Sequence, residues 1–148
     1  MIQGTMTAMI TPFRNGAIDD ERLAENVARQ IAENVDGLVP VGTTGESPTL
    51  SHAEHRQVIE KVVQTANGKT RVIAGTGSNS TSEALELTEH AAEVGADAAL
   101  LVNPYYNKPT QEGLYRHFMT IADKVNLPIV LYNIPGRTNI TMTPQTVA

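Results

Sequence analysis

Two adjacent threonines, Thr43 and Thr44, stand between glycines in the segment GTTGE at residues 42–46. Glycines let a backbone approach a ligand closely, and free N–H groups beside threonine hydroxyls can bind a carboxylate or another oxyanion. A threonine hydroxyl can also relay a proton. The segment lacks the Gly-Lys-Ser/Thr ending of a Walker loop, so it does not indicate a nucleotide site. A tight turn capped by the two hydroxyls is the purely structural alternative.

Tyrosines and one arginine could extend this chemistry. Tyr105 and Tyr106 stand between two prolines, and Tyr132 lies near the end of a later apolar run. A phenol can donate and accept protons if its neighbours tune its pKa, which is about 10 in water. Arg137 follows a Pro-Gly pair, a stiff turn from which a guanidinium could clamp a substrate carboxylate. Packing tyrosines and a solvated arginine are the alternatives that each residue alone would favour.

Lysine and histidine suggest two other kinds of site, and we favour neither. Lys108 could form an imine with a carbonyl substrate only if it were desolvated, whereas its place between Asn and Pro in a loop predicts exposure. His52 and His55 flank Glu54 and superficially suggest a metal pair. No third ligand lies nearby in sequence and Glu54 fits a capping role, so we expect two surface imidazoles and no metal site.

Composition narrows the class of protein. The 148 residues are 41% hydrophobic, which predicts one soluble globular domain. With 11 basic against 16 acidic residues and no basic cluster, the chain lacks the positive field that nucleic-acid binding requires. No apolar run reaches the length of a membrane span and no secretory signal is recognisable, so we expect a cytoplasmic protein. The absence of cysteine removes disulfides and thiolate catalysis, and no cofactor is predicted.

The elements that must position these residues are five short strands separated by four helices. Runs rich in β-branched residues recur roughly every 30 residues, the length of a strand with its crossover helix. They lie within residues 4–13, 37–42, 71–77, 98–106 and 128–135. All five are predicted to be buried on both faces.

Capping residues mark where the helices begin. Asp19 precedes one apolar stripe, Thr110 precedes another, and two S-x-x-E capping boxes begin at Ser51 and Ser80. Thr143 and a following proline announce one more helix. Parallel strands with helical crossovers follow, so we expect an α/β fold in which residues 1–148 are the N-terminal part, about five βα units, of one TIM (β/α)8 barrel, ending before strand six. A small open α/β domain is the alternative.

The polar loops follow the strands and therefore share one end of the sheet, where α/β folds place their active sites. We expect five residues to meet there in one cavity: Thr43, Thr44, Tyr106, Tyr132 and Arg137.

Three of these loops, GTTGE, PYYNKP and YNIPGRT, occur in this order on the βα frame. Together with TAMITPF, IAGTGSNST and QEGLYRHF, they resemble the dihydrodipicolinate (4-hydroxy-tetrahydrodipicolinate) synthase family of Schiff-base pyruvate lyases, a superfamily that includes N-acetylneuraminate lyase. The resemblance implies condensation of pyruvate with L-aspartate semialdehyde through a lysine Schiff base, in the diaminopimelate route to lysine. The double threonine and the Pro-Gly-Arg-Thr turn favour the synthase over a related sugar-acid aldolase.

The resemblance also implies roles for the residues singled out above. Thr43, Tyr106 and Tyr132 would form a proton relay. Thr44 would help to bind the carboxylate of pyruvate, and Arg137 would hold that of the semialdehyde.

Assembly and regulation are implied in the same way. The tyrosine at position 106 would reach across a tight-dimer interface, in a homo-oligomer that is most often a dimer of dimers. An allosteric lysine pocket at that interface would comprise Ser47, His52, His55, Asn79, Glu83 and Tyr105, with Pro48 departing from the small residue often found there. The family's imine-forming lysine would lie beyond Ala148, so these residues alone should be inactive. A non-catalytic, self-associating half-barrel is the alternative from another functional class.

Overall fold

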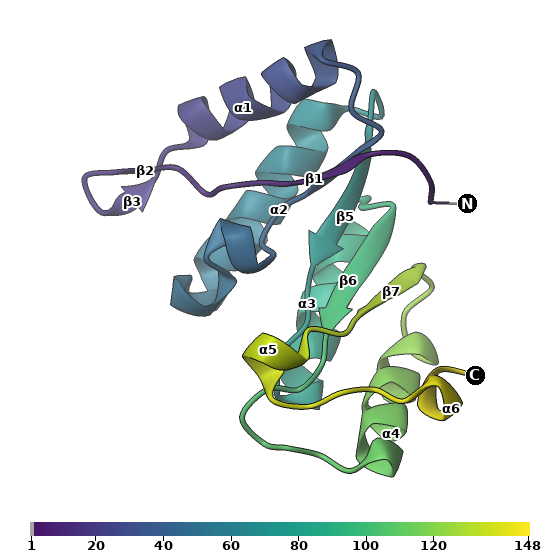
Figure 1. The fold of residues 1–148 in the computed structure, drawn as a ribbon. Helices are drawn as coiled ribbons and strands as arrows, with labels where there is room; N and C mark the ends of the chain where they lie inside the picture. Colours follow the sequence, from purple (N-terminus) through teal and green to yellow (C-terminus); the bar gives the residue numbers. More distant parts are fainter. Residues whose placement is uncertain (1) are drawn as a thin grey trace.

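Five parallel strands form a single sheet in the order β1-β4-β5-β6-β7, and Figure 1 shows the neighbouring strands β5 and β6 side by side. The structure, a computed structural model, describes residues 2–148. The strands are β1 (Met6–Ala8), β4 (Gly37–Val39), β5 (Arg71–Gly75), β6 (Ala98–Val102) and β7 (Ile129–Tyr132). All five lie in the predicted segments, and their parallel pairing confirms the α/β fold class.

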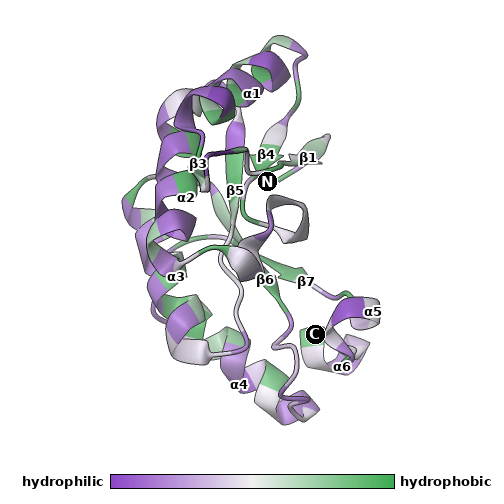
Figure 2. Cartoon of the chain, turned by 90° about the vertical axis from the view of Figure 1, so that its left-hand side faces the viewer, coloured by the Kyte–Doolittle hydropathy of each residue, from purple (hydrophilic) through white to green (hydrophobic). Residues whose placement is uncertain are grey.

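Four long helices connect the strands and cover one face of the sheet (Figure 2). They are α1 (Asp20–Ala32), α2 (His52–Ala66), α3 (Thr81–Glu93) and α4 (Gln111–Ala122). Their apolar stripes pack inward against the strands, which buries side chains such as Leu23, Val58, Leu114 and Ile121 completely or almost completely. Among the described helices, none is long and apolar enough to cross a membrane.

The predicted burial of all five strands on both faces is wrong at the sheet's edges. Strand β6 is largely buried, whereas every residue of β7 is only partly buried and Ala8 of β1 is exposed. The reason is topological, because β1 and β7 each pair with one neighbouring strand within residues 2–148. Apolar composition alone does not separate an edge strand from a central one.

The predicted helix starts are confirmed by their capping hydrogen bonds. Asp19 accepts a bond from the Arg22 N–H at 3.0 Å. Ser51 and Glu54 form the reciprocal capping box, with the Ser51 N–H donating to the Glu54 carboxylate at 2.8 Å. Thr110 caps α4 in the same manner as Asp19 caps α1.

The second predicted capping box is only half correct. Ser80 accepts from the Glu83 N–H at 3.5 Å, but the Glu83 carboxylate does not return to the Ser80 N–H. It accepts instead from the Ser78 hydroxyl and pairs with His52 on α2. Glu83 therefore does not complete the cap of its own helix. It lines a cavity described below.

Several short elements lie outside the expected pattern. Strands β2 (Phe13–Arg14) and β3 (Ala17–Ile18) form an antiparallel hairpin whose turn is Asn15-Gly16, both with positive φ. An Asn-Gly pair is itself a strong sequence signal for a hairpin turn. The loop after β4 contains two 3₁₀ turns, η1 (Thr43–Gly45) and η2 (Ser47–Thr49).

Two single-turn helices follow β7. The turn predicted around Arg137 is the helix α5 (Pro135–Thr138). The helix announced by Thr143 is α6 (Pro144–Val147), with proline in its first turn as predicted.

Candidate functional site

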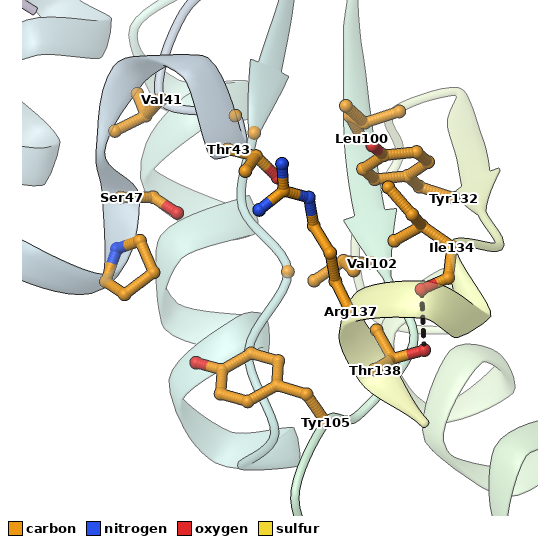
Figure 3. A pocket seen from close by; sticks show the side chains of 14 residues that line it. Val41, Thr43, Ser47, Leu100, Val102, Tyr105, Tyr132, Ile134, Arg137 and Thr138 are labelled. Atoms are coloured by element: carbon orange, nitrogen blue, oxygen red, sulfur yellow. Dashed lines mark hydrogen bonds between the residues drawn. The ribbon is translucent and has the colours of Figure 1, made fainter. Parts of the chain in front are cut away.

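The carboxyl ends of the strands surround a cavity of about 240 Å³, here called the strand-end cavity (Figure 3). Its lining comes from every loop that the sequence predicted to converge there: Val41, Gly42, Thr43, Ser47, Pro48, Gly75, Gly77, Leu100, Val102, Tyr105, Tyr132, Ile134, Arg137 and Thr138. The cavity mixes an apolar floor with a few hydroxyl groups and one guanidinium, which is the usual make-up of a small-molecule site.

The loop carrying the two threonines is held in a strained shape. Val41, a buried β-branched residue, has φ 52°, a left-handed conformation that such side chains rarely adopt. Next along the chain, the Gly45 and Glu46 N–H groups close the η1 turn onto the carbonyls of Gly42 and Thr43. Those bonds leave the N–H groups of Thr43 and Thr44 at the open start of the turn.

A buried hydroxyl from the first βα loop supports this turn from behind. Thr11, only 4% exposed, donates to the Gly45 carbonyl at 2.7 Å. Gly45 is closely packed, because a Cβ there would lie 3.1 Å from the Met9 carbonyl oxygen, which is tighter than an ordinary van der Waals contact. The position of Thr43 is therefore set by packing against the end of β1.

Arg137 and Tyr132 approach Thr43 from the opposite wall. Arg137 extends from α5 toward Thr43, and Tyr132 lies beside it at the end of β7 (Figure 3). No ion pair joins Arg137 to an acidic side chain of residues 2–148, so its guanidinium is available to a carboxylate. Thr43 itself is exposed to the cavity's solvent.

The expectation of one cavity for all the chemical residues is wrong for Tyr106. This residue does not line the strand-end cavity, and its side chain is 88% exposed with φ 70°. Thr44 is likewise exposed and outside the lining. A loop held between two prolines predicts stiffness, but which of two adjacent tyrosines turns inward depends on the backbone angles, and Tyr105 is the one that does.

None of the chain's four lysines, all of them described, lines the strand-end cavity. Lys108 is exposed, as predicted.

A second cavity of about 350 Å³, here called the histidine cavity, lies between the starts of α2 and α3. Its lining residues are Ser47, Pro48, Leu50, His52, His55, Gly77, Ser78, Glu83, Leu87 and Tyr105. Five of the six residues predicted to form a lysine pocket are among them, and Asn79 is not. Four residues line both cavities, so the two cavities share a wall: Ser47, Pro48, Gly77 and Tyr105.

The two histidines have different surroundings, and the expectation of two surface imidazoles is wrong for His55. His52 is 59% exposed and pairs with Glu83. His55 is 5% exposed, and its Nδ1 has no hydrogen-bond partner in the described part of the chain. Burial, with a smaller contribution from His52, lowers the pKa of His55 to about 4, so the ring is neutral at pH 7.

Glu83 supplies the charge of the histidine cavity. The Ser78 hydroxyl donates to Glu83 at 2.5 Å, and this bond, more than the neighbouring His52, lowers the pKa of the Glu83 carboxyl. Ser78 was not predicted as a site residue. The signal was present in the spacing S-x-S-x-x-E, which offers Glu83 two competing serines. Within residues 2–148 no three histidines or carboxylates gather as metal ligands would.

Known proteins resemble this chain in sequence and in fold. The dihydrodipicolinate synthetase family matches residues 1–148. A 4-hydroxy-tetrahydrodipicolinate synthase from Citrifermentans bemidjiense is 60% identical over 148 residues, which are 100% of this chain and 51% of the relative. The chain therefore spans about half the length of the curated relatives it matches.

Solved structures agree. A dihydrodipicolinate synthase from Acinetobacter baumannii, complexed with pyruvate, is 52% identical with a TM-score of 0.96, over 99% of this chain and 50% of that one. The enzyme from Cyanidioschyzon merolae, with lysine bound, is 48% identical with a TM-score of 0.90, over 97% and 49%. These matches confirm the predicted architecture, the N-terminal part of a (β/α)8 barrel.

Proposed function

The chain belongs to the dihydrodipicolinate synthetase family, and we propose that it is the N-terminal half of a 4-hydroxy-tetrahydrodipicolinate synthase, one domain with the rest of the barrel. Such an enzyme condenses pyruvate with L-aspartate semialdehyde in lysine biosynthesis. The observation that carries the proposal is the meeting of Thr43, Tyr132 and Arg137 around one strand-end cavity.

The proposed chemistry needs an amine, a proton relay and two carboxylate sites. A lysine outside residues 1–148 condenses with the ketone of pyruvate and releases water. Loss of a methyl proton gives an enamine, whose carbon attacks the aldehyde of the second substrate. Imine formation places two protons on the oxygen that leaves as water, enamine formation removes one from the methyl carbon, and the attack on the aldehyde places one on its oxygen. Cyclisation of the adduct, in which its own amine replaces the lysine at the imine carbon, then frees the lysine. Thr43 and Tyr132 both line the cavity, which supports their hydroxyls as the groups that carry those protons.

Carboxylate binding divides between the two walls of the cavity. The open N–H groups of Thr43, which lines the cavity, and of the neighbouring Thr44, which does not, suit the carboxylate of pyruvate. Arg137, which has no acidic partner among the described side chains, suits the carboxylate of the semialdehyde and can bind it with two parallel bonds.

Tyr106 completes the relay from a second copy of the protein. Its 88% exposure and left-handed backbone project the phenol away from its own strand-end cavity. We propose a homodimer in which each Tyr106 enters the neighbouring site, and pairs of such dimers in a tetramer. We propose that such an enzyme is located in the cytoplasm.

The histidine cavity is the proposed site for lysine as a feedback inhibitor. The Glu83 carboxylate, kept ionised by Ser78, suits an ammonium group. The unpartnered Nδ1 of neutral His55 adds one more polar contact. The bound lysine in the Cyanidioschyzon merolae relative supports this assignment, as does the position of Tyr105 between the two cavities, since a ligand that moves Tyr105 also reshapes the strand-end cavity.

The proposal is tested by turnover with the whole protein. We expect consumption of pyruvate with aspartate semialdehyde and little or none with 2-keto-3-deoxy sugar acids. Thr43→Val, which keeps the side-chain shape and removes the hydroxyl, should lower kcat by about 100-fold or more. Preferential cleavage of a sugar acid would overturn the synthase in favour of a related aldolase.

A further inference from the structure

Arg137 sits on a segment with little regular structure of its own. Residues 133–142 leave β7, form the single turn α5 and run to α6. Such a segment needs side-chain contacts to keep one shape, because few backbone bonds define it. The position of Arg137 opposite Thr43 therefore depends on whatever fixes this segment to the sheet.

A buried amide side chain makes that connection. Asn103 follows β6 and is 0% exposed. Its backbone N–H donates to the Tyr132 carbonyl at 3.2 Å, which extends the ladder between β6 and β7. Its side-chain Nδ2 donates to Asn133 Oδ1 at 2.8 Å and to the Ile140 carbonyl at 3.4 Å. One residue thus contacts the chain both before and after α5.

The direction of these hydrogen bonds is fixed by chemistry. The Met142 backbone N–H, which can only donate, lies 3.2 Å from Asn133 Oδ1, so that atom must be the oxygen of the Asn133 amide. The Asn103 atom facing the same oxygen must then be the nitrogen. Both of its hydrogens have carbonyl-type acceptors, whereas Asn103 Oδ1 has no partner among residues 2–148.

The Thr138 hydroxyl closes the same loop from inside. Thr138 is 2% exposed and lies within hydrogen-bond distance of the Ile134 carbonyl, at 3.1 Å (Figure 3), and of the Ile140 carbonyl, at 3.0 Å. The segment is therefore a closed loop whose two ends both attach to the Asn103 amide. Arg137 projects from its middle.

We propose that Asn103 is a positioning residue for the reaction, because its two amide hydrogens, through Asn133 and Ile140, hold the loop that aims Arg137 at the strand-end cavity. Asn103 does not line the cavity, so it would act on the reaction through the loop that carries Arg137. The inference rests on the proposed function for its kinetic readout alone.

Asn103→Asp is the sharpest test, because it keeps the shape of the side chain and replaces both donors with an oxygen that faces two acceptors. In the whole protein we expect KM for aspartate semialdehyde to rise about tenfold or more, since a misplaced Arg137 loses a charged hydrogen bond, while KM for pyruvate changes little. The Met142 amide should lose its protection from hydrogen exchange in the same variant. Asn103→Leu, which lacks donors but brings no charge, should show a smaller effect in the same direction.

Thr88→Val provides a matched control. Thr88 is also 0% exposed, and its hydroxyl bonds Thr76 and the Ala84 carbonyl on α3, away from the loop. We expect it to lower stability without changing either KM. If Asn103→Asp does not fold, Asn103→Leu decides the matter.

Two results would overturn the inference: an unchanged KM for the semialdehyde, or a greater effect of Leu than of Asp, which would show that volume and not donation matters. A wild-type protein without condensation activity would instead refute the proposed function. Hydrogen exchange of the Met142 amide would then still test the structural role of Asn103. Retained protection of that amide in Asn103→Asp would contradict the proposal that Asn103 holds the loop.

Discussion

Gly75 lies directly against the strained backbone of Val41. A Cβ at position 75 would be 2.4 Å from the Val41 carbonyl oxygen, and the Gly75 N–H donates to the Pro40 carbonyl at 3.0 Å. Strand β5 is thereby in close contact with the loop after β4, at the left-handed residue that comes shortly before Thr43. Strain of this kind persists only where the surrounding structure fixes it.

Gly75→Ala should consequently destabilise the protein by about 1–3 kcal/mol, because the new methyl group collides with backbone atoms that cannot rotate away. Activity should fall as well, since relief of the collision moves Thr43. Urea unfolding measures the first effect. Gly136→Ala is the control, because a Cβ there meets no atom within 4 Å. Equal stability of the two variants would contradict this account of the loop.

Mixed dimers test whether Tyr106 serves the neighbouring site. Tyr106→Phe and Thr43→Val should each be nearly inactive. Both variants should fold normally, because both side chains are exposed. When the two variants are mixed and allowed to exchange subunits, half of the sites in a mixed dimer regain both hydroxyls. Activity should then recover to about a quarter of wild type at equal mixing, since half of the dimers are mixed. No recovery would place Tyr106 in the site of its own subunit.

Lysine binding tests the histidine cavity. Glu83→Gln should weaken the affinity for L-lysine by about tenfold or more in calorimetry, because the ammonium group loses its charged partner. Glu86→Gln is the control, since Glu86 lies on the same helix but pairs with Arg56 outside the cavity, at 3.6 Å. If both variants bind lysine as the wild type does, lysine does not occupy this cavity.

His55 should make stability depend on pH in a defined window. Its pKa is about 4 in the folded protein against an ordinary 6.5, mainly because of burial, and its charged or titratable neighbours are His52, Arg56, Glu83 and His90. Between pH 6.5 and 4, His55 is protonated in the unfolded chain but stays neutral in the folded protein. The free energy of unfolding therefore falls by about 3 kcal/mol across this window and levels off below pH 4.

His55→Gln should flatten that slope, as measured by urea unfolding between pH 7 and 4.5. Buried His117, whose pKa burial also lowers, leaves part of the slope in place. Glu83 contributes only below its ordinary value of 4.5, because its pKa is lowered. An identical slope in the variant and the wild type would show that His55 is protonated without cost.

Local signals predicted the frame of this molecule well. A cap such as Ser51-x-x-Glu54 is decided within one turn, and a βα repeat fixes which loops share an end of the sheet. These signals were sufficient to predict that Thr43, Tyr132 and Arg137, which are far apart in the chain, line one cavity.

The errors arose where contacts between elements decide the outcome. His55 and His52 lie on the same helix, yet His55 is 5% exposed and the His52 side chain is 59% exposed, because burial depends on which neighbouring elements cover each side chain. Glu83 left its capping role because Ser78 and His52, neither in its own helix, offered stronger partners. Asn103 carried no motif at all, since its two acceptors lie 30 and 37 residues away.

The most direct test of the central claim is mass spectrometry of the whole protein after borohydride reduction in the presence of pyruvate. We predict one covalent pyruvate adduct on a lysine outside residues 1–148, and no gain of mass in the 148-residue chain treated alone. An adduct on Lys108, or on any other lysine of this chain, would contradict the account.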